Sequence, residues 1–309
     1  MATDKQVKGA VLGFLIGDAW GLSYAEQGVP LGPLPMIGSN RFPHGTYTDA
    51  GAMLLTTIAS LNENGSVDLS DLMSRLHDWY LASYLTSAKS HDGEDYVETK
   101  LNVIQSIKNF DTGMPPDRCA VIDELSYNNA GLLRILPVAL LDAHKHLDVI
   151  IRDAHLVTRL TNKVPRAEVV SAVFALLVSN IFLDRSEKVF DVLADYYKEH
   201  GLEAHADELT AFRQWKEGNA PSGTNDARDC FWSAWTAYSS NQDAFEAAIV
   251  QSIRLGNNCN ETAALAGALA GLRLGSDNIP DDYLAAMRIG NQALDEITKF
   301  IKTVKRLQT

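Results

Sequence analysis

The sequence predicts an all-α protein built as one domain of many helices. Apolar residues recur at helical spacing along most of the chain, and the alternating patterns that mark strands are almost absent. No linker-like stretch divides the 309 residues, so we expect a single domain over residues 1–309. With 46% hydrophobic and 21% charged residues, the composition is that of an ordinary globular protein.

Glycine spacing is the main feature of the first predicted helix, at about 5–20. Its glycines recur every fourth residue, so they share one face and leave it nearly bare of side chains. These residues are Gly9, Gly13, Gly17 and Gly21. Another helix can therefore approach this face closely. The following segment, 22–47, is rich in Gly and Pro and is predicted to be irregular, and loops of this length are commonly functional.

Helical patterns continue through the rest of the chain. Pro137 is expected to kink its helix or to lie near its start, and no segment is expected to be long enough to span a bilayer. The further helices are predicted at about 50–62, 69–87, 96–110, 132–141, 147–160, 166–182, 186–199, 204–216, 226–238, 242–255, 260–274 and 295–307.

Charge, cysteines and histidines narrow the classes of function. The net charge of -12 argues against a non-specific nucleic-acid binder, because neutralising phosphates requires clustered Lys and Arg. Cys119, Cys230 and Cys259 are far apart and lack the close pairing of zinc sites or disulfide scaffolds. The histidines form no i, i+4 pair with supporting acids, which favours surface or core roles. The N-terminus lacks the pattern of a signal peptide, so we expect a cytoplasmic protein with neither nucleic acid nor membrane as partner.

Two predicted helices begin with clusters of polar residues. Thr48 and Asp49 precede one helix, and Asn258 and Glu261 lie at the start of another that is rich in Ala and Gly. Thr48 and Asn258 are good N-cap residues, and Glu261 completes something like a capping box. Converging polar helix starts would alternatively form a pocket for an anion or a metal. The residues alone leave both interpretations open.

Five segments, in order along most of the chain, resemble those of the ADP-ribosylglycohydrolases, a family that includes the dinitrogenase reductase-activating glycohydrolase. The resemblance implies that family's fold, a single orthogonal multi-helix domain. It also implies two Mg²⁺ ions between the helix starts and water attack on the anomeric carbon of an ADP-ribosyl group. The segments are 9–21 (GAVLGFLIGDAWG), 44–53 (HGTYTDAGAM), 126–134 (SYNNAGLLR), 159–167 (RLTNKVPRA) and 256–271 (GNNCNETAALAGALAG).

The first metal-binding segment of that family is only partly kept here. Thr48 and Asp49 match it, whereas Ala50 and Gly51 stand where the family has a second aspartate and a threonine. The family's loop glutamate has no counterpart in register, and Glu26 is one position away from it. Hard divalent ions are held by anionic oxygens, so this loss weakens the implied metal site.

The last segment departs further. Asn258 and Asn260 replace two aspartates, and Glu261 replaces a threonine. Neutral amide oxygens are poor at concentrating two divalent ions. The remnants Thr48, Asp49 and Glu261 therefore predict no dinuclear Mg²⁺ centre, and a single weakly held ion stays open as an alternative.

The substrate side of the resemblance is better kept. The 126–129 segment matches residues that lie against the diphosphate and ribose in the family, and Asn162 replaces a histidine of the pocket. The alternative is a simple turn, since Ser and Asn favour turns. The predicted ligand-binding residues are Ser126, Tyr127, Asn129, Asn162, Asn258 and Asn260.

Two functions follow from these comparisons of residues. In the first, the chain is a pseudo-hydrolase that binds an ADP-ribose-like small molecule, an ADP-ribosylated protein or another protein partner without cleaving it. In the second, it is a divergent hydrolase of an ADP-ribosyl or related N- or O-glycosidic bond, with one metal or a glutamate base and with Glu26, Glu261 and Asp49 as candidate catalytic residues. The lost ligands favour the first, because catalytic replacement demands geometry that the sequence does not show.

Overall fold

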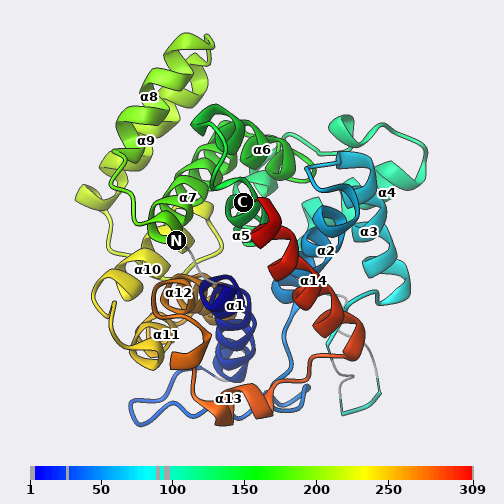
Figure 1. Cartoon of the computed structure of the whole chain (residues 1–309), viewed down its shortest axis with the longest axis vertical. Coiled ribbons are helices and arrows are strands. Elements are labelled where there is room, and N and C mark those ends of the chain that lie inside the picture. The colour runs from blue at the N-terminus through cyan, green and yellow to red at the C-terminus, as the bar shows by residue number, and fades with distance from the viewer. Residues whose placement is uncertain (1–3, 26–27, 88–90, 94–97, 308–309) are drawn as a thin grey trace.

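A computed structural model describes residues 4–25, 28–87, 91–93 and 98–307 and confirms the all-helical fold (Figure 1). In this part of the chain there are fourteen α-helices, four short 3-10 helices and no strand. The α-helices are α1 (Asp4–Ala25), α2 (Asp49–Asn64), α3 (Leu69–Ala82), α4 (Leu101–Asp111), α5 (Leu136–Asp142), α6 (Leu147–Arg159), α7 (Pro165–Leu183), α8 (Val189–Glu199), α9 (Glu203–Gly218), α10 (Ala227–Ser239), α11 (Phe245–Ile253), α12 (Cys259–Leu274), α13 (Asp281–Ala286) and α14 (Asn291–Leu307). The 3-10 helices are η1 (Pro116–Arg118), η2 (Glu124–Tyr127), η3 (Leu132–Arg134) and η4 (Ser276–Asn278).

Helices α1 and α12 make the closest helix pair of the fold. A Cβ atom added at Gly13 would lie only 2.2 Å from the carbonyl oxygen of Gly267, and one added at Gly21 would lie 2.3 Å from the Cα of Asn260. Only glycine permits such an approach of two backbones. The partner position falls along α12 as the position rises along α1, so the helices run antiparallel. The prediction that another helix approaches the glycine face is confirmed, and the pairing places the start of α12 beside the second half of α1.

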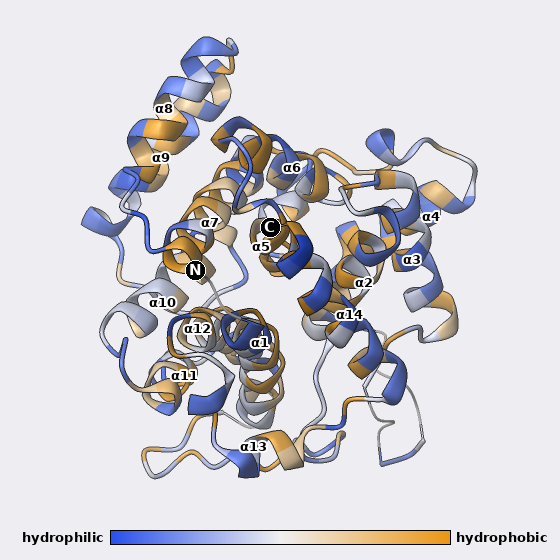
Figure 2. Ribbon diagram, in the orientation of Figure 1, coloured by the Kyte–Doolittle hydropathy of each residue, from blue (hydrophilic) through white to orange (hydrophobic). Residues whose placement is uncertain are grey.

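The other helices surround this pair. In Figure 1 helices α10 and α11 flank α12, α2, α3 and α4 gather on the opposite side of the molecule, and α8 and α9 project together from one corner. Helix α14 carries both strongly hydrophilic and hydrophobic residues (Figure 2). It buries Ile297, Phe300 and Val304, one or two turns apart, and it contacts α2.

Helix α7 corrects one expectation. It is 19 residues long with a mean hydropathy of 1.7, so by length and composition it is able to cross a membrane, contrary to the prediction that no segment is. However, 72% of its apolar window is buried inside the fold, as in the core helix of a globular protein. Its apolarity follows from contact with α5, α6 and α9 on several sides.

Several helix boundaries differ from the sequence prediction. Helix α3 ends at Ala82 rather than near 87, because Ser83 adopts a left-handed conformation with φ 56°. Pro137 lies in the first turn of α5, where its missing N–H costs no hydrogen bond. The short helix α13 was not predicted at all. The predicted start near 96 falls in 94–97, outside the described residues, and α4 is described from Leu101.

Candidate functional site

The starts of α2 and α12 converge on a buried carboxylate of α1, that of Asp18. This carboxylate accepts hydrogen bonds from the backbone N–H groups of Thr48 at 2.8 Å and Gly51 at 2.9 Å. It also accepts from the Thr48 hydroxyl at 2.7 Å, and the Asn260 amide nitrogen lies 3.4 Å from its Oδ1. Asp18 therefore ties together both helix starts that the sequence singles out.

The two helix starts are capped differently. Thr48 is the N-cap of α2, and its side-chain oxygen accepts from the Ala50 N–H at 3.2 Å, which confirms the capping prediction there. Asn258 is the N-cap residue of α12 but makes no side-chain cap hydrogen bond. Its amide nitrogen instead donates to the Glu261 carboxylate, so the capping prediction was wrong for the Asn258 side chain. The polar groups of this second start face the site.

The Glu261 carboxylate is bonded by three side chains of the site. Its Oε1 forms an ion pair with the ammonium of Lys100, and both side chains are largely buried, with 4% and 16% of their surfaces exposed. Its Oε2 accepts from the amide nitrogens of Asn129, at 2.7 Å, and Asn258. One ammonium and two amides thus occupy the carboxylate that the sequence offered as a metal ligand or a base.

Asp49 is a second buried carboxyl group that lines the same cavity as Lys100. Its Oδ2 accepts a hydrogen bond from the Thr99 hydroxyl at 2.7 Å. Burial raises the pKa of Asp49, the positive charge of Lys100 lowers it, and the negative charge of Glu261 raises it, for a net upward shift. Burial alone would lower the pKa of Lys100, but the charges of Glu261 and Asp49 outweigh it and raise that pKa. Lys100 is therefore an ammonium ion that pairs with Glu261 and is further stabilised by the charge of Asp49.

Two other buried groups near the helix starts have displaced pKa values. Burial raises the pKa of Asp18 to about 7, despite the hydrogen bonds from Thr48 and Gly51 that favour its charged form. Burial likewise raises the pKa of the Cys259 thiol to about 11. A thiol in that state is a poor nucleophile, even though it stands at a helix start.

Two cavities meet at Lys100. The first, of about 290 Å³, is where the candidate metal and ligand residues come together, and the second, of about 370 Å³, extends toward the 126–129 segment. The first is lined by Leu22, Ala25, Asp49, Glu98, Thr99, Lys100, Asn258, Asn260 and Glu261. The second is lined by Lys100, Leu101, Asn102, Glu124, Leu125, Tyr127, Asn128, Asn225 and Asp226.

Residues of the 126–129 segment and the nearby Asn162 have two kinds of position: some line the second cavity, and others are buried and hold the loop in place. Tyr127 borders the second cavity with 37% of its surface exposed, and the guanidinium of Arg166 lies 4.2 Å from its ring centroid. Ser126 and Asn162 are fully buried. Ser126 donates to the Val121 carbonyl at 2.7 Å, and the Asn162 amide nitrogen donates to the Ser126 carbonyl at 3.0 Å. These two predicted ligand residues hold the loop from beneath.

The structure brings most of the candidate residues predicted from the sequence into one site. One candidate is not described, and three residues of the site were not predicted. Glu26 lies outside the described residues. Asp18, Thr99 and Lys100 were missed as site residues. Asp18 belongs to the Gly-Asp-Ala part of the first matched segment, which was a usable signal. Lys100 had none, because it meets Glu261 across 161 positions of sequence.

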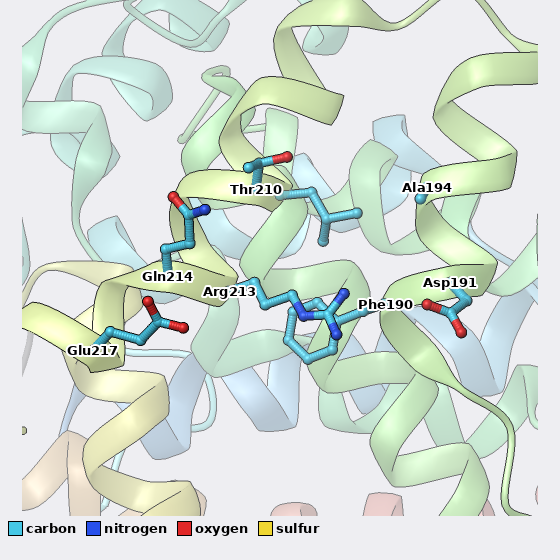
Figure 3. Close-up of a pocket in the computed structure, with 8 residues that line it drawn as sticks. Phe190, Asp191, Ala194, Thr210, Arg213, Gln214 and Glu217 are labelled. Carbon is cyan, nitrogen blue, oxygen red and sulfur yellow. The ribbon is translucent and has the colours of Figure 1, made fainter.

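A further cavity, of about 340 Å³, lies between α8 and α9, away from the converging helix starts (Figure 3). Arg213 crosses it, with its guanidinium 5.7 Å from the ring centroid of Phe190. Asp191 and Glu217 add negative charge at its edges. It contains none of the residues that the sequence comparison singled out.

Comparison with known proteins gives the following. A family model described as ADP-ribosylglycohydrolase matches residues 1–308. A solved structure titled "ADP-ribosylglycohydrolase-related protein complex" is similar over 99% of this chain and 99% of its own, with 24% sequence identity and a TM-score of 0.75. At this identity the structural likeness is one of fold. A search of curated proteins found no match.

Proposed function

This chain belongs to the ADP-ribosylglycohydrolase family, and from that membership we propose that it binds an ADP-ribose-like ligand, free or attached to a protein, without Mg²⁺-dependent hydrolysis. The observation that carries the proposal is the buried ion pair of the Lys100 ammonium with Glu261, beside the negative charge of Asp49. It stands among the same helix starts where the resemblance implies the metal ions. The proposal therefore concerns one site whose positive charge comes from the chain itself.

The residues present do not fit two magnesium ions. Mg²⁺ requires near-octahedral oxygen coordination and is usually held by carboxylates. Here Glu261 already bonds an ammonium and two amide nitrogens. Asp18 already accepts three hydrogen bonds from Thr48 and Gly51. The amide of Asn260 also directs its nitrogen, not its oxygen, toward Asp18 and Thr48, so it opposes a cation at that point.

Lys100 supplies the positive charge that buried carboxylates require. A carboxylate left in a low-dielectric interior without a cation is strongly destabilising. The pKa of Lys100 is raised by Glu261 and Asp49, so the side chain stays charged at neutral pH. One monovalent ammonium cannot polarise and position water as two divalent ions do. Lys100 thus supplies the cation of this site in place of a metal ion but not the nucleophile activation that the family's two ions are implied to provide.

The second cavity supports ligand binding. Tyr127 lines this cavity with 37% of its surface exposed, and the nearby asparagines offer donors and acceptors for hydroxyl or phosphate groups. Arg166 adds a cation on Tyr127, although it also pairs with Asp226. In the family, residues matching this segment lie against the diphosphate and ribose. An ADP-ribose-like molecule, with an aromatic base and an anionic linker, has groups complementary to both features.

The divergent-hydrolase alternative rests on a single metal ion or on a glutamate base. Of the two glutamates, Glu26 lies outside the described residues, and no contact of the described residues favours Glu261. Glu261 is engaged by Lys100, Asn129 and Asn258 and is poorly placed to accept a proton from water. Asp18 has a pKa of about 7, a suitable value for a base, but it is fully buried and occupied by Thr48 and Gly51. Pseudo-hydrolase binding is thus the better supported function.

Calorimetry with ADP-ribose tests the binding proposal. The full chain is titrated with ADP-ribose in the presence of EDTA and again in millimolar Mg²⁺, with Tyr127→Ala as the site variant and Leu81→Ala, at an exposed position on α3, as the control. We expect binding in both buffers, weakened about tenfold or more in Tyr127→Ala and unchanged in Leu81→Ala. Binding that requires Mg²⁺, or no binding in either buffer, would overturn the proposal.

A further inference from the structure

A second cluster of polar residues lies in the core, apart from the helix starts. His155 of α6, Glu168 of α7 and His205 of α9 are all buried, and one donor atom from each lies within 4.8 Å of the others. The His205 Nε2 atom lies 2.8 Å from the Glu168 Oε2. No function discussed above uses these residues. They converge from three helices onto one point.

We propose that His155, Glu168 and His205 form a site for a transition-metal ion of the Zn²⁺ class. Two imidazole nitrogens and one carboxylate oxygen form a donor set that suits Zn²⁺, Co²⁺ or Ni²⁺ and not Mg²⁺ or Ca²⁺, which require oxygen ligands. Zinc bonds of about 2.0–2.1 Å place tetrahedral ligand atoms roughly 3.4 Å apart. The donor atoms already lie within 4.8 Å of one another, so a bound ion has to draw them about 1 Å closer.

The protonation states favour a metal. Burial lowers the pKa of His155 to about 3, so its imidazole is neutral and able to ligate. Burial raises the pKa of Glu168, but its hydrogen bonds with His205 and Arg159 outweigh that and lower it, so the carboxylate is ionised. With Glu168 ionised, His205 Nε2 donates a hydrogen bond to it in the metal-free protein, and ligation of a metal through Nε2 uses the other neutral tautomer of the imidazole.

In the metal-free protein the Arg159 guanidinium pairs with the Glu168 carboxylate, so it would compete with a metal ion for that ligand. Its guanidinium nitrogen lies 2.7 Å from the Glu168 Oε2, and 35% of the side chain is exposed, so it reaches inward from the surface and is free to move outward. The remaining groups that face the cluster are the phenols of Tyr196 and Tyr197, and the Tyr197 hydroxyl lies 3.2 Å from His155 Nε2. A bound ion would replace the guanidinium as the cation of Glu168 and tie α9, one arm of the projecting pair, to α6 and α7.

Zinc titration of the full chain tests this site. The protein is stripped with a chelator and titrated with Zn²⁺ by calorimetry, and Co²⁺ is added separately as a probe whose visible absorption reports coordination by imidazole. The variants are His205→Gln, which removes a ligand, and Arg159→Met, which removes the competing cation. His146→Gln changes an exposed histidine and serves as the control.

We expect one equivalent of Zn²⁺ to bind the native chain and His146→Gln equally. Binding should weaken at least tenfold in His205→Gln and tighten several-fold in Arg159→Met, a gain that a purely structural role of the cluster does not produce. If His205→Gln fails to fold, the Arg159→Met gain still decides the question, since that substitution begins at a partly exposed side chain. The absence of stoichiometric binding in both the native chain and Arg159→Met, or binding untouched by His205→Gln, would overturn the proposal.

Discussion

The Lys100 ammonium and the Glu261 carboxylate form a buried ion pair across 161 positions of sequence. Lys100 stands immediately before α4, and Glu261 lies in the first turn of α12. The pair joins a loop to the helix start where the family resemblance implies metal ions. Its energetic role is measurable because one partner can be removed while the other stays buried.

Replacing Lys100 by Met should lower the free energy of unfolding by about 3 kcal/mol, because Glu261 and Asp49 then lie buried without a cation. Millimolar Ca²⁺ or Mg²⁺ should restore part of the loss by binding the freed carboxylates. Urea unfolding with and without the ions measures both effects. Lys8→Met, at an exposed position on α1, is the control and should show neither. A Lys100→Met protein that is as stable as the native chain would show that the ammonium is not needed there.

A double-mutant cycle should show strong coupling between Lys100 and Glu261. Glu261→Gln alone leaves a buried ammonium without its carboxylate partner, and Lys100→Met alone leaves a buried carboxylate without its ammonium. The double variant leaves neither charge unpaired. We expect a coupling energy of about 2 kcal/mol or more from denaturant unfolding of the four proteins. Additive losses would mean that the two side chains do not interact in solution.

Adding one methyl group at Gly13 should be far more costly than adding it at Gly218. The new Cβ at Gly13 would lie 2.2 Å from the Gly267 carbonyl oxygen, so α1 and α12 must separate, whereas Gly218 has no atom within 4 Å of its added Cβ. We expect Gly13→Ala to lose about 3 kcal/mol or more of unfolding free energy, and Gly218→Ala to stay within about 1 kcal/mol of the native chain. Thermal and urea unfolding compare the two. Equal stability of the variants would contradict the close packing of these helices.

Asp142 should make stability fall as pH rises. Burial raises the pKa of this carboxyl from 3.8 to about 7, and the neighbouring Asp153 adds to the shift, while Lys145 opposes it. Between these pH values the folded chain holds a proton that the unfolded chain releases, so the free energy of unfolding decreases from about pH 4 to about pH 7. The contribution of this one group is up to about 4 kcal/mol.

The Asp142→Asn variant cannot titrate at this position, so its stability should decline less over the same pH range. The pKa of Asp18 is also raised to about 7, so this residue contributes part of the fall in the free energy of unfolding in both proteins. Asp243→Asn, at an exposed position, is the control and should follow the native profile. Urea midpoints measured at intervals from pH 4 to pH 7 give the comparison. Parallel profiles for the native chain and Asp142→Asn would exclude Asp142 as the source.

Local and periodic features of the fold were predictable from the sequence. The four-residue spacing of Gly13 and its neighbours predicted a close helix partner, and Thr48 was predicted as a cap. Those features depend on residues within one helix or one turn. Helix α13 was missed because six residues show too little periodicity to be recognised. The end of α3 was missed because Ser83 adopts a left-handed backbone conformation, which a serine does not predict.

The site was predictable only where a motif existed. The resemblance pointed to Asp49, Glu261 and the asparagines, and the structure gathers them around one cavity. The role of Lys100 in the site could not be predicted, because a lysine before a helix is common and its partner lies far away in the sequence. Asn258 was misjudged because the amide of an N-cap asparagine can either accept from a backbone N–H or donate to a carboxylate three residues later, and the spacing alone does not distinguish the two.

Release of ADP-ribose from ADP-ribosyl-arginine and ADP-ribosyl-serine peptides in millimolar Mg²⁺ tests the central claim most directly. The full native chain is compared with Asp49→Asn, which removes the one aspartate kept from the first metal-binding segment. With Lys100 paired to Glu261 and supplying the positive charge beside Asp49, we expect no release above the protein-free control from either protein. Mg²⁺-dependent release by the native chain that disappears in Asp49→Asn would contradict the account.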